Sequence, residues 1–243
     1  MKVVVHPKYQ WASDFIASLP CRFSQEGEML YQGRNLVKRF EWQGHTFIVK
    51  RYKRPKLIQR LAYTFWRKSK AERAYLFADK LLSLGIDTPE GIAYMEEKES
   101  GLFATGYFVS ACCTDRPVYP ELVPVADFDK QLASSLAAFF AELHGKGILH
   151  GDLNLNNILY RLNPDGTYHF SVIDTNRSVF KESLTPSECY DNLKRVAHRR
   201  DLLHFIVAEY ARVRSWNVEA TVAAVEKSLT RFERKRRLRG YLK

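Results

Sequence analysis

Residues 150–157 read His-Gly-Asp-Leu-Asn-Leu-Asn-Asn, and this stretch determines how the rest of the chain is interpreted. It places a carboxylate, Asp152, five residues before an amide, Asn157. Hard oxygen ligands of this kind are the ones that Mg²⁺ prefers. The residues before it repeat apolar side chains at helical spacing, at Leu132, Leu136, Phe139, Phe140 and Leu143. The stretch is therefore expected in a loop that follows a buried helix ending near Gly145.

A tight hairpin is expected directly after this loop. Asn-Pro-Asp-Gly at residues 163–166 is a strong turn sequence between two β-rich runs. Reflecting Asn157 through the centre of the turn lands near residue 172. Asn157 and Asp174 are therefore expected at the same open end of the hairpin, where their oxygen atoms can share a cation.

The N-terminal half is expected to be rich in β-structure. Residues 36–42 and 45–52 are β-rich runs separated by a Gly-containing turn, which predicts a hairpin. A helix is expected from about Ser69 to Leu84, with Gly85 as its stop, and a further strand over residues 102–112. The first thirty residues indicate little beyond an opening strand near Met29-Leu30-Tyr31.

A stretch punctuated by Pro117, Pro120 and Pro124 is expected to separate two parts of the chain. The N-terminal part, of about residues 1–114, is predicted to be small and β-rich. The C-terminal part, of about residues 115–243, is predicted to be mainly helical. The chain is thus expected to have an α+β fold, as one domain of two lobes over residues 1–243.

The loop resembles the catalytic loop of protein-kinase-like enzymes. Residues 150–157 match the pattern H-x-D-L-x-x-x-N at all four fixed positions, and Ile173-Asp174 falls where the metal-binding Asp of these enzymes lies. The order of elements also matches, because a Lys-bearing strand and a helix with an acid in its first turn come before the loop. The resemblance implies a two-lobed protein-kinase-like fold and the transfer of phosphate from ATP.

Three residues of the C-terminal part receive roles from this resemblance. Asp152 would be the catalytic residue that accepts or orients the proton of the attacking hydroxyl. Asn157 and Asp174 would hold Mg²⁺ across the phosphates of ATP. A capping Asn and a turn Asp are the structural alternatives for these two. His150 is expected to fix the loop by hydrogen bonding and to have no acid-base role.

Three residues of the N-terminal part would bind ATP. Lys50, in Phe-Ile-Val-Lys, matches the strand lysine that neutralises the α- and β-phosphates, and its alternative is a surface lysine. Glu72 would hold Lys50 in place, unless it only stabilises the N-terminus of its helix. Gly33 would be the glycine of the phosphate loop, although no full glycine-rich motif is present. These residues are expected to surround one nucleotide-bound magnesium together with Asp152 and its neighbours.

Departures from the common kinase pattern indicate which family of kinase-like enzymes the chain resembles. Thr175-Asn176-Arg177 follows Asp174 in place of Phe-Gly, and no Ala-Pro-Glu follows, so the peptide-docking region of regulated protein kinases is missing. The chain resembles the lipopolysaccharide core kinases of Gram-negative bacteria, which phosphorylate Kdo or heptose. Less specific similarities to this family are found at Gly33-Arg34-Asn35, Ile48-Val49-Lys50-Arg51, Ala71-Glu72-Arg73, Gly85-Ile86-Asp87-Thr88-Pro89 and Arg199-Arg200-Asp201. They do not indicate whether the acceptor sugar is Kdo or heptose.

The net charge of +11 is concentrated in two segments. Residues 50–73 carry ten Lys or Arg against one acid, and residues 231–243 carry seven against one. Such clusters attract polyanions, and the resemblance implies lipopolysaccharide core and lipid A as the acceptor, with an anionic membrane surface as a further partner. A solvated basic surface is the simpler alternative. No nucleic acid is expected, because neither segment has a recognised reader motif.

The sequence also indicates where the protein works. No run reaches the ~18 apolar residues of a membrane span, and the N-terminus lacks the apolar stretch of a secretory signal. The four cysteines form no C-x-x-C pair and are expected as reduced thiols in the core. A cytoplasmic protein is therefore expected, and the resemblance adds a peripheral position at the inner membrane.

Two rival interpretations stay open at this point. An atypical serine protein kinase of the RIO type shares the His-x-Asp-Leu loop, the metal Asp after a hairpin and the missing activation segment. A kinase-shaped module that binds polyanions without catalysis is the second rival, and the presence of Lys50, Glu72, Asp152, Asn157 and Asp174 speaks against it.

Overall fold

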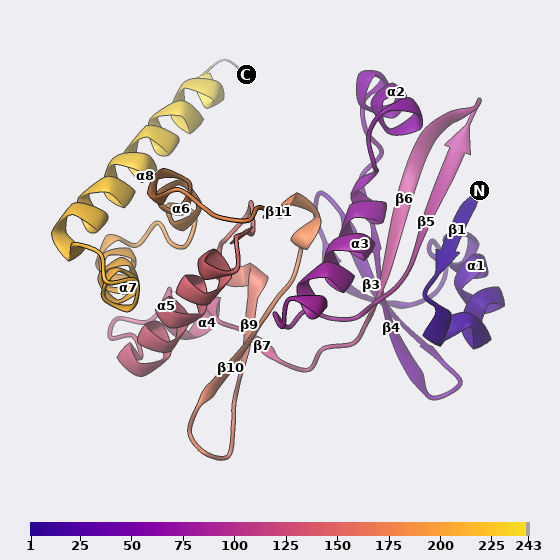
Figure 1. The fold of residues 1–243 in the computed structure, drawn as a ribbon. Coiled ribbons are helices and arrows are strands. Elements are labelled where there is room, and N and C mark those ends of the chain that lie inside the picture. Colours follow the sequence, from indigo (N-terminus) through magenta and orange to yellow (C-terminus); the bar gives the residue numbers. More distant parts are fainter. Residues whose placement is uncertain (242–243) are drawn as a thin grey trace. The chain divides into compact units, whose positions relative to one another are not determined.

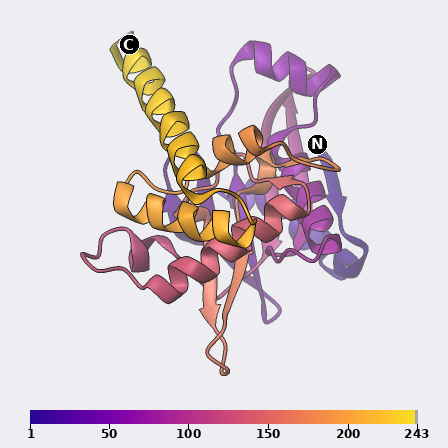
Figure 2. The same cartoon turned by 60° about the vertical axis from the view of Figure 1, so that its left-hand side comes forward.

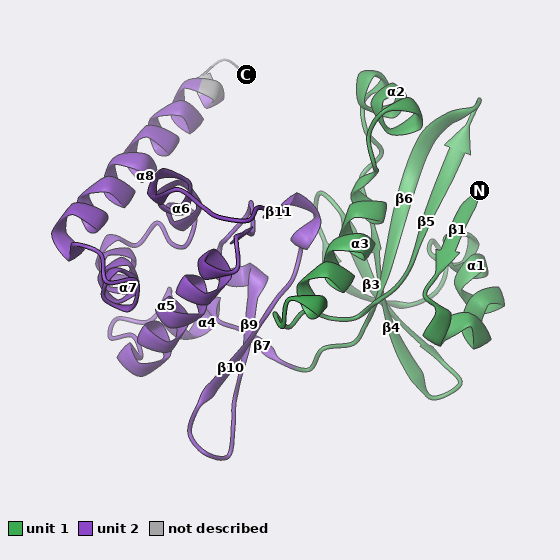
Figure 3. Cartoon of the chain, in the orientation of Figure 1, with its two compact units in different colours: residues 1–114 green, residues 115–243 purple. Residues whose placement is uncertain are grey.

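The computed structural model describes residues 1–241, so the last two residues of the basic segment 231–243 lie outside the described part. The chain divides into two compact units, residues 1–114 and residues 115–243 (Figure 3). The first unit contains a six-stranded antiparallel sheet, and most helices belong to the second. The predicted α+β class is therefore confirmed.

The sheet of the first unit has the strand order β1-β5-β6-β4-β3-β2 (Figure 1). Its strands are β1 (Lys2–Val5), β2 (Glu28–Gln32), β3 (Leu36–Trp42), β4 (His45–Arg51), β5 (Gly91–Glu99) and β6 (Leu102–Ala111). The predicted hairpin is β3–β4, which turns at Gln43 and Gly44, both at positive φ. Two strands, β1 and β5, were not predicted, and β5 lies between β1 and β6.

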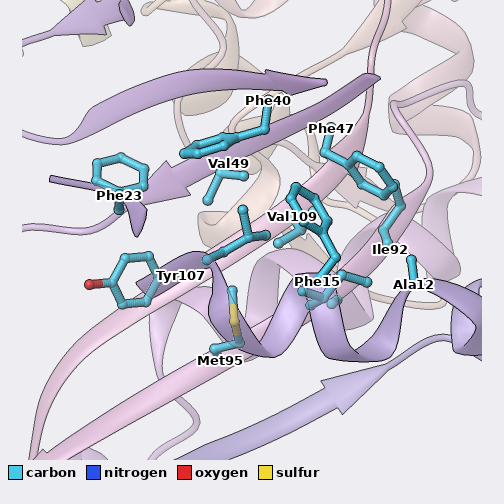
Figure 4. Packing of buried hydrophobic residues seen from close by; sticks show 13 residues of the cluster. Ala12, Phe15, Phe23, Phe40, Phe47, Val49, Ile92, Met95, Tyr107 and Val109 are labelled. Carbon is cyan, nitrogen blue, oxygen red and sulfur yellow. The ribbon is translucent and has the colours of Figure 1, made fainter. Parts of the chain in front are cut away.

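The N-terminal residues form the main core of this unit, although little was expected of them. The 3₁₀ helix η1 (Pro7–Ala12) leads into α1 (Ser13–Arg22), which covers one face of the sheet. Phe15 stacks on Trp42 with ring centroids 5.0 Å apart. Figure 4 shows this cluster, whose labelled members are Ala12, Phe15, Phe23, Phe40, Phe47, Val49, Ile92, Met95, Tyr107 and Val109.

The opposite face of the sheet carries α3 (Lys70–Ser83). Small side chains let this helix approach closely, because Ala71, Ala74 and Ala78 are its buried residues on this side. A Cβ at Gly106 of β6 would lie only 3.0 Å from that of Ala71. The predicted helix stop is confirmed, since Gly85 has φ of +68° directly after the last turn. A shorter helix, α2 (Leu57–Phe65), contacts β6 further along the sheet (Figure 1).

The second unit packs its helices around α5 (Lys130–Gly145), the buried helix that was predicted. Asp129 caps α5 by accepting hydrogen bonds from the backbone N–H groups of Gln131 and Leu132. Helix α7 packs against α5 and α8 packs against α7 (Figure 2). The other helices are α4 (Tyr119–Leu122), α6 (Pro186–Leu193), α7 (Arg200–Val213) and α8 (Val218–Tyr241), and the strands are β7 (Arg116–Pro117), β8 (Ile148–Leu149), β9 (Ile158–Leu162), β10 (Tyr168–Val172) and β11 (Val179–Phe180).

The expectation that all four cysteines are core thiols is wrong. Cys189 is buried, but Cys21 and Cys112 are exposed and Cys113 is half-buried. Cys residues are usually buried, but Cys21 lies in the last turn of α1 and Cys112 directly follows β6, where the chain leaves its regular element and meets solvent. Among residues 1–241, no helix has the length and apolar character needed to cross a membrane.

Candidate active site

The loop at residues 150–157 is held by alternating buried leucines. Leu153 and Leu155 are buried, whereas Asn154 between them is half-buried and Asn156 after them is exposed. The backbone carbonyl of Asp152 accepts hydrogen bonds from the backbone N–H of Asn154 (2.8 Å) and from the side-chain amide of Asn157 (2.9 Å). A short 3₁₀ turn, η2 (Leu155–Asn157), is capped by Asn154. The loop therefore fixes the positions of Asp152 and Asn157 by its own hydrogen bonds.

The hairpin brings Asn157 and Asp174 to the same end of the ladder. Strand β9 pairs with β10 in a register that places Ile158 opposite Val172. The next pair is therefore Asn157 with Ile173, and the N–H of Ile173 donates to the carbonyl of Asn157 at 2.9 Å. The expected partner was residue 172, one residue away. The difference arises because Asn163 and Thr167 close the turn, which moves its centre by half a residue.

Asp174 has a strained backbone. Its φ of 58° and ψ of 43° lie in the left-handed region, directly before the 3₁₀ turn η3 (Thr175–Arg177). Aspartate tolerates this conformation better than most residues, but a non-Gly residue there costs of order 1–3 kcal/mol. The side-chain amide of Asn176 donates a hydrogen bond to Asp174 Oδ1. Such backbone strain is typical of functional sites, where it holds a side chain in the orientation that the site needs.

His150 joins the loop to the hairpin. Its Nε2 lies 2.9 Å from the carbonyl oxygen of Ile173, so Nε2 must carry the proton, because a carbonyl only accepts. Burial lowers the pKa of His150, which keeps the ring neutral. The side chain is 2% exposed. These contacts agree with a structural role, in which the ring ties the loop to the residue before Asp174.

Gly151 allows the loop to pass close to residue 177. The short strand β8 pairs with β11 and so holds the two chain segments together. Gly151 has φ of +74°, and a Cβ at this position would lie 2.3 Å from the carbonyl oxygen of Arg177. Only glycine fits such an approach without a shift of one segment. This close contact was not foreseen, although a Gly beside a catalytic-loop Asp is a signal for it.

Two arginines contact the carboxylate of Asp152, and neither was predicted as a site residue. Arg195 Nη1 lies 3.3 Å from Asp152 Oδ1, and Arg177 Nη1 lies 3.5 Å from Oδ2. The guanidinium of Arg195 also lies over the ring of Phe232 in α8, 5.0 Å from its centroid. The three side chains of this cluster keep partial access to solvent. An anionic ligand could therefore replace the Asp152 carboxylate as the partner of the two guanidinium groups.

In the first unit, Lys50 faces the side of the sheet that α3 covers. Its neighbour Val49 points into the core beneath α1, and successive side chains of a strand alternate between faces. Tyr52 lies on the same side as Lys50 and packs with Ala71 of α3. Lys50 Nζ lies 5.4 Å from the centroid of the Tyr52 ring. The lysine is therefore beside the first turn of α3.

Glu72 occupies this first turn of α3. Ser69 caps the helix by accepting a hydrogen bond of 3.1 Å from the backbone N–H of Glu72. Glu72 Oε1 lies 3.8 Å from Nζ of Lys2 in β1. Lys2 is thus an unforeseen cation for this carboxylate, and the pairing of Glu72 with Lys50 stays a prediction.

Gly33 lies in the exposed connection between β2 and β3. Its N–H donates to the carbonyl of Asn35 at 3.1 Å, which makes a tight turn. A Cβ at Gly33 would lie 2.4 Å from the hydroxyl oxygen of Tyr31. Asn35 Oδ1 accepts a hydrogen bond of 3.1 Å from the backbone N–H of Lys53, which ties the turn to the end of β4. The turn is thus a small, exposed loop anchored at both ends.

The donor set fits a magnesium ion that is held mainly by phosphates. Asn157 and Asp174 offer one amide and one carboxylate, the number of protein ligands that a nucleotide-bound Mg²⁺ usually takes. Within residues 1–241 there is no cluster of three or more His, Cys, Asp or Glu side chains that could hold a metal ion. The second unit thus joins Asp152, Asn157 and Ile173, the residue before Asp174, by hydrogen bonds.

Comparison with known proteins identifies the family. The sequence model of the lipopolysaccharide kinase (Kdo/WaaP) family matches residues 17–216. None of the curated proteins matches the chain. Among solved structures, the chain is similar to one described as WaaP in complex with acyl carrier protein, with 15% identity and a TM-score of 0.61 over 97% of this chain and 98% of that one. That likeness confirms the kinase-like fold. The chain is a kinase and belongs to the lipopolysaccharide kinase (Kdo/WaaP) family.

Proposed function

We propose that the chain transfers the γ-phosphoryl group of ATP to a hydroxyl of Kdo or heptose in the inner core of lipopolysaccharide. The family supplies the class of acceptor. The observation that carries the proposal is the assembly of Asp152, Asn157 and Ile173, joined by two hydrogen bonds of 2.9 Å. It keeps a base next to two residues suited to magnesium, which is the arrangement that phosphoryl transfer to a hydroxyl needs.

In the proposed reaction, Asp152 accepts the proton of the attacking sugar hydroxyl. The hydroxyl oxygen forms a bond to the γ-phosphorus while the bond from that phosphorus to the β,γ-bridging oxygen breaks, and ADP leaves with the electron pair. The proton on Asp152 then passes to solvent. Asn157 and Asp174 would hold the magnesium ion, which neutralises charge on the β- and γ-phosphates.

The first unit would contribute to nucleotide binding. Lys50 would neutralise the α- and β-phosphates, and Glu72 would orient the Lys50 ammonium group. Gly33 would let the backbone of its turn approach a phosphate, as glycine does in phosphate-binding loops. We propose that both units act as the lobes of one kinase domain over residues 1–243. The close packing of Tyr52 and Ala71, next to Lys50 and Glu72, supports this division of roles.

The arginines beside Asp152 favour an acidic acceptor. Kdo carries a carboxylate, and inner-core sugars commonly carry phosphate groups. Such an anion can take over the contacts that Arg177 and Arg195 make with Asp152 at 3.5 and 3.3 Å. Release of these contacts would free the carboxylate for its role as a base. Because the acceptor is a membrane glycolipid and ATP is cytoplasmic, the protein would act at the cytoplasmic face of the inner membrane.

A direct assay tests this function. The full chain is incubated with γ-labelled ATP, Mg²⁺ and purified core glycolipids that end in either Kdo or heptose, and mass spectrometry of the product locates the added phosphate. We expect label in the glycolipid, little label with Lys50→Met, and none above background with Asp152→Ala. Label that enters protein substrates and no glycolipid would support the RIO-type alternative and overturn the proposal.

A further inference from the structure

Helix α2 rests on the sheet through its polar side. Arg60 Nε donates a hydrogen bond of 2.7 Å to the carbonyl oxygen of Phe103 in β6, and the N–H of Phe103 donates one of 2.9 Å to Thr64 Oγ1. The ring of Tyr63 makes an edge contact with that of Phe103, with centroids 5.3 Å apart. The guanidinium of Arg60 also reaches Glu99 at the end of β5. Polar groups and one tyrosine therefore attach this helix to its own unit.

The apolar side of α2 faces solvent. Leu57, Leu61 and Phe65 recur every four residues, and Ile58 lies beside them, so they share one face of the helix. Exposure is 59% for Leu57, 81% for Ile58, 63% for Phe65 and 80% for Trp66, which directly follows the helix, whereas Leu61 is half-buried. No residue of α2 is buried. An ordinary surface helix buries its apolar face, and α2 has the opposite arrangement.

Exposed basic residues flank this apolar face at both ends. Between residues 53 and 68 the chain has six Lys or Arg and no acid. Five of the basic side chains are exposed, namely Lys53, Arg54, Lys56, Arg67 and Lys68. One of them, Arg54, pairs with Glu99. The apolar face is thus bordered by cations on both sides along the chain.

We propose that α2 and its flanks bind the surface of an anionic phospholipid bilayer. Leu57, Ile58 and Phe65 would enter the boundary between headgroups and acyl chains, and the indole of Trp66 would lie at the headgroup level. The flanking lysines and arginines would contact lipid phosphates. A bilayer fits better than a protein partner, because an exposed apolar helix face combined with neighbouring Lys and Arg is the pattern of helices that bind anionic membrane surfaces.

This inference goes beyond the phosphoryl transfer and does not depend on it. Membrane binding by α2 needs no nucleotide, and none of its residues belongs to the candidate active site. Its practical consequence is that the enzyme would be concentrated where a membrane glycolipid is found. Each Lys or Arg near an anionic surface is worth about fivefold in affinity, and each large apolar side chain that leaves water contributes about tenfold or more.

Vesicle co-sedimentation of the full chain tests the proposal, without ATP or glycolipid. Vesicles of phosphatidylethanolamine with phosphatidylglycerol should bind the chain, and vesicles of phosphatidylcholine alone should bind it much less. The variant Ile58→Ser/Phe65→Ser/Trp66→Ser should lose about a thousandfold in binding to the anionic vesicles. The variant Lys56→Gln/Arg67→Gln/Lys68→Gln should lose about a hundredfold at low salt, and less at high salt.

A matched control tests whether any replacement of exposed apolar side chains by serine weakens vesicle binding. Leu162 and Val213 are 57% and 54% exposed and lie in the second unit. Their double variant Leu162→Ser/Val213→Ser should bind vesicles as the wild type does. Thermal unfolding should show that both serine variants are folded. Trp66 gives a separate signal, since a blue shift of emission on vesicles in the wild type should be reduced in Trp66→Phe.

Several outcomes would overturn the proposal. Equal binding of the triple serine variant and the wild type would mean that charge alone attracts the chain. If the wild type binds no vesicles but self-associates, and the triple variant does not self-associate, the apolar face contacts a second copy of the chain. Phosphorylation of a delipidated core oligosaccharide should be unchanged in the triple variant. If the wild type does not phosphorylate this oligosaccharide, the proposed function is contradicted, but the result on membrane binding still holds.

Discussion

The side-chain amide of Asn157 donates a hydrogen bond of 2.9 Å to the backbone carbonyl of Asp152. Asn157 therefore uses its nitrogen inside the loop, and its side-chain oxygen is the atom available to a cation. The backbone carbonyl of Asn157 accepts a further bond of 2.9 Å from Ile173, the residue before Asp174. Asn157 thus connects Asp152 to the residue before Asp174, through its side chain on one side and its backbone on the other.

Replacing Asp152 with Asn should remove the base and keep the shape of the loop. We expect turnover to fall about 10²- to 10⁴-fold, the usual contribution of a general base. Stability should change little, because ion pairs between partly exposed side chains contribute about 0–1 kcal/mol. Steady-state rates and thermal unfolding check both points. Asp191→Asn is a matched control, since Asp191 is an exposed carboxylate paired with Lys194.

The two functions of Asn157 can be separated by substitution. Asn157→Asp keeps an oxygen ligand and loses the donor to the carbonyl of Asp152, whereas Asn157→Leu loses both. We expect the half-saturating Mg²⁺ concentration to rise strongly in Asn157→Leu and much less in Asn157→Asp. Titration of activity with Mg²⁺ at saturating ATP measures this difference. An equal response of the two variants would show that Asn157 acts only through the loop.

Arg177 and Arg195 should determine the affinity for an acidic acceptor. A charge-assisted hydrogen bond contributes about 1.5–3 kcal/mol, so Arg177→Ala or Arg195→Ala should raise KM for the acceptor about 10- to 100-fold. KM for ATP should change little. The effect should weaken at high salt, because both side chains keep access to solvent. Arg161→Ala is the control, as Arg161 is an exposed arginine paired with Asp115.

Local patterns predicted most of the elements that carry the candidate residues. The β3–β4 hairpin with Lys50, the capped start of α3 with Glu72 and the loop with Asp152 each depend on neighbours in sequence, which propensity and turn chemistry describe well. The register of β9–β10 followed from its turn to within one residue. These features need no knowledge of distant segments.

The parts that were missed depend on distant contacts. Arg195 meets Asp152 from 43 residues away, and no pattern near either residue indicates the pairing. Helix α1 contains Pro20 and has no side-chain cap, so its sequence lacks the usual start signal, and its stability comes from the sheet that it covers. Strand β5 ends in Glu-Glu-Lys-Glu, a run typical of surface helices. Its pairing with β1 and β6 outweighs this local preference.

His144 should make the stability of the second unit depend on pH. Its ring contacts the hydroxyl of Tyr210 at 2.9 Å and Asn192 Oδ1 at 3.1 Å, and burial lowers its pKa to about 4. As the pH falls, His144 of the unfolded chain takes up a proton near pH 6.5, whereas the buried ring of the folded chain does so only near pH 4. The neutral ring therefore contributes fully to the free energy of unfolding above pH 6.5, and this contribution is lost as the pH falls toward 4. The loss amounts to about 3 kcal/mol.

Denaturant unfolding at several pH values measures this effect. His144→Gln should be less stable than the wild type at pH 7.5 and should lose less stability between pH 6.5 and 4.5. His45→Gln is the control, because His45 is an exposed residue of the first unit and does not belong to the core around His144. Parallel pH profiles for the wild type and His144→Gln would assign the acid sensitivity to other groups.

Two glycines with similar backbone angles should respond differently to alanine. Gly151 has φ of +74° and Gly166 has φ of +82°, so alanine at either position carries the left-handed penalty of about 1–2 kcal/mol. A Cβ at Gly166 meets nothing within 4 Å, whereas one at Gly151 would lie 2.3 Å from the Arg177 carbonyl oxygen. Overpacking adds about 1–3 kcal/mol, so Gly151→Ala should destabilise more than Gly166→Ala.

Relief of the clash must move either Asp152 or Arg177, and the activity of Gly151→Ala should therefore fall further than its folded fraction. Equal stability and activity in the two variants would show that the loop and residue 177 do not approach each other in solution.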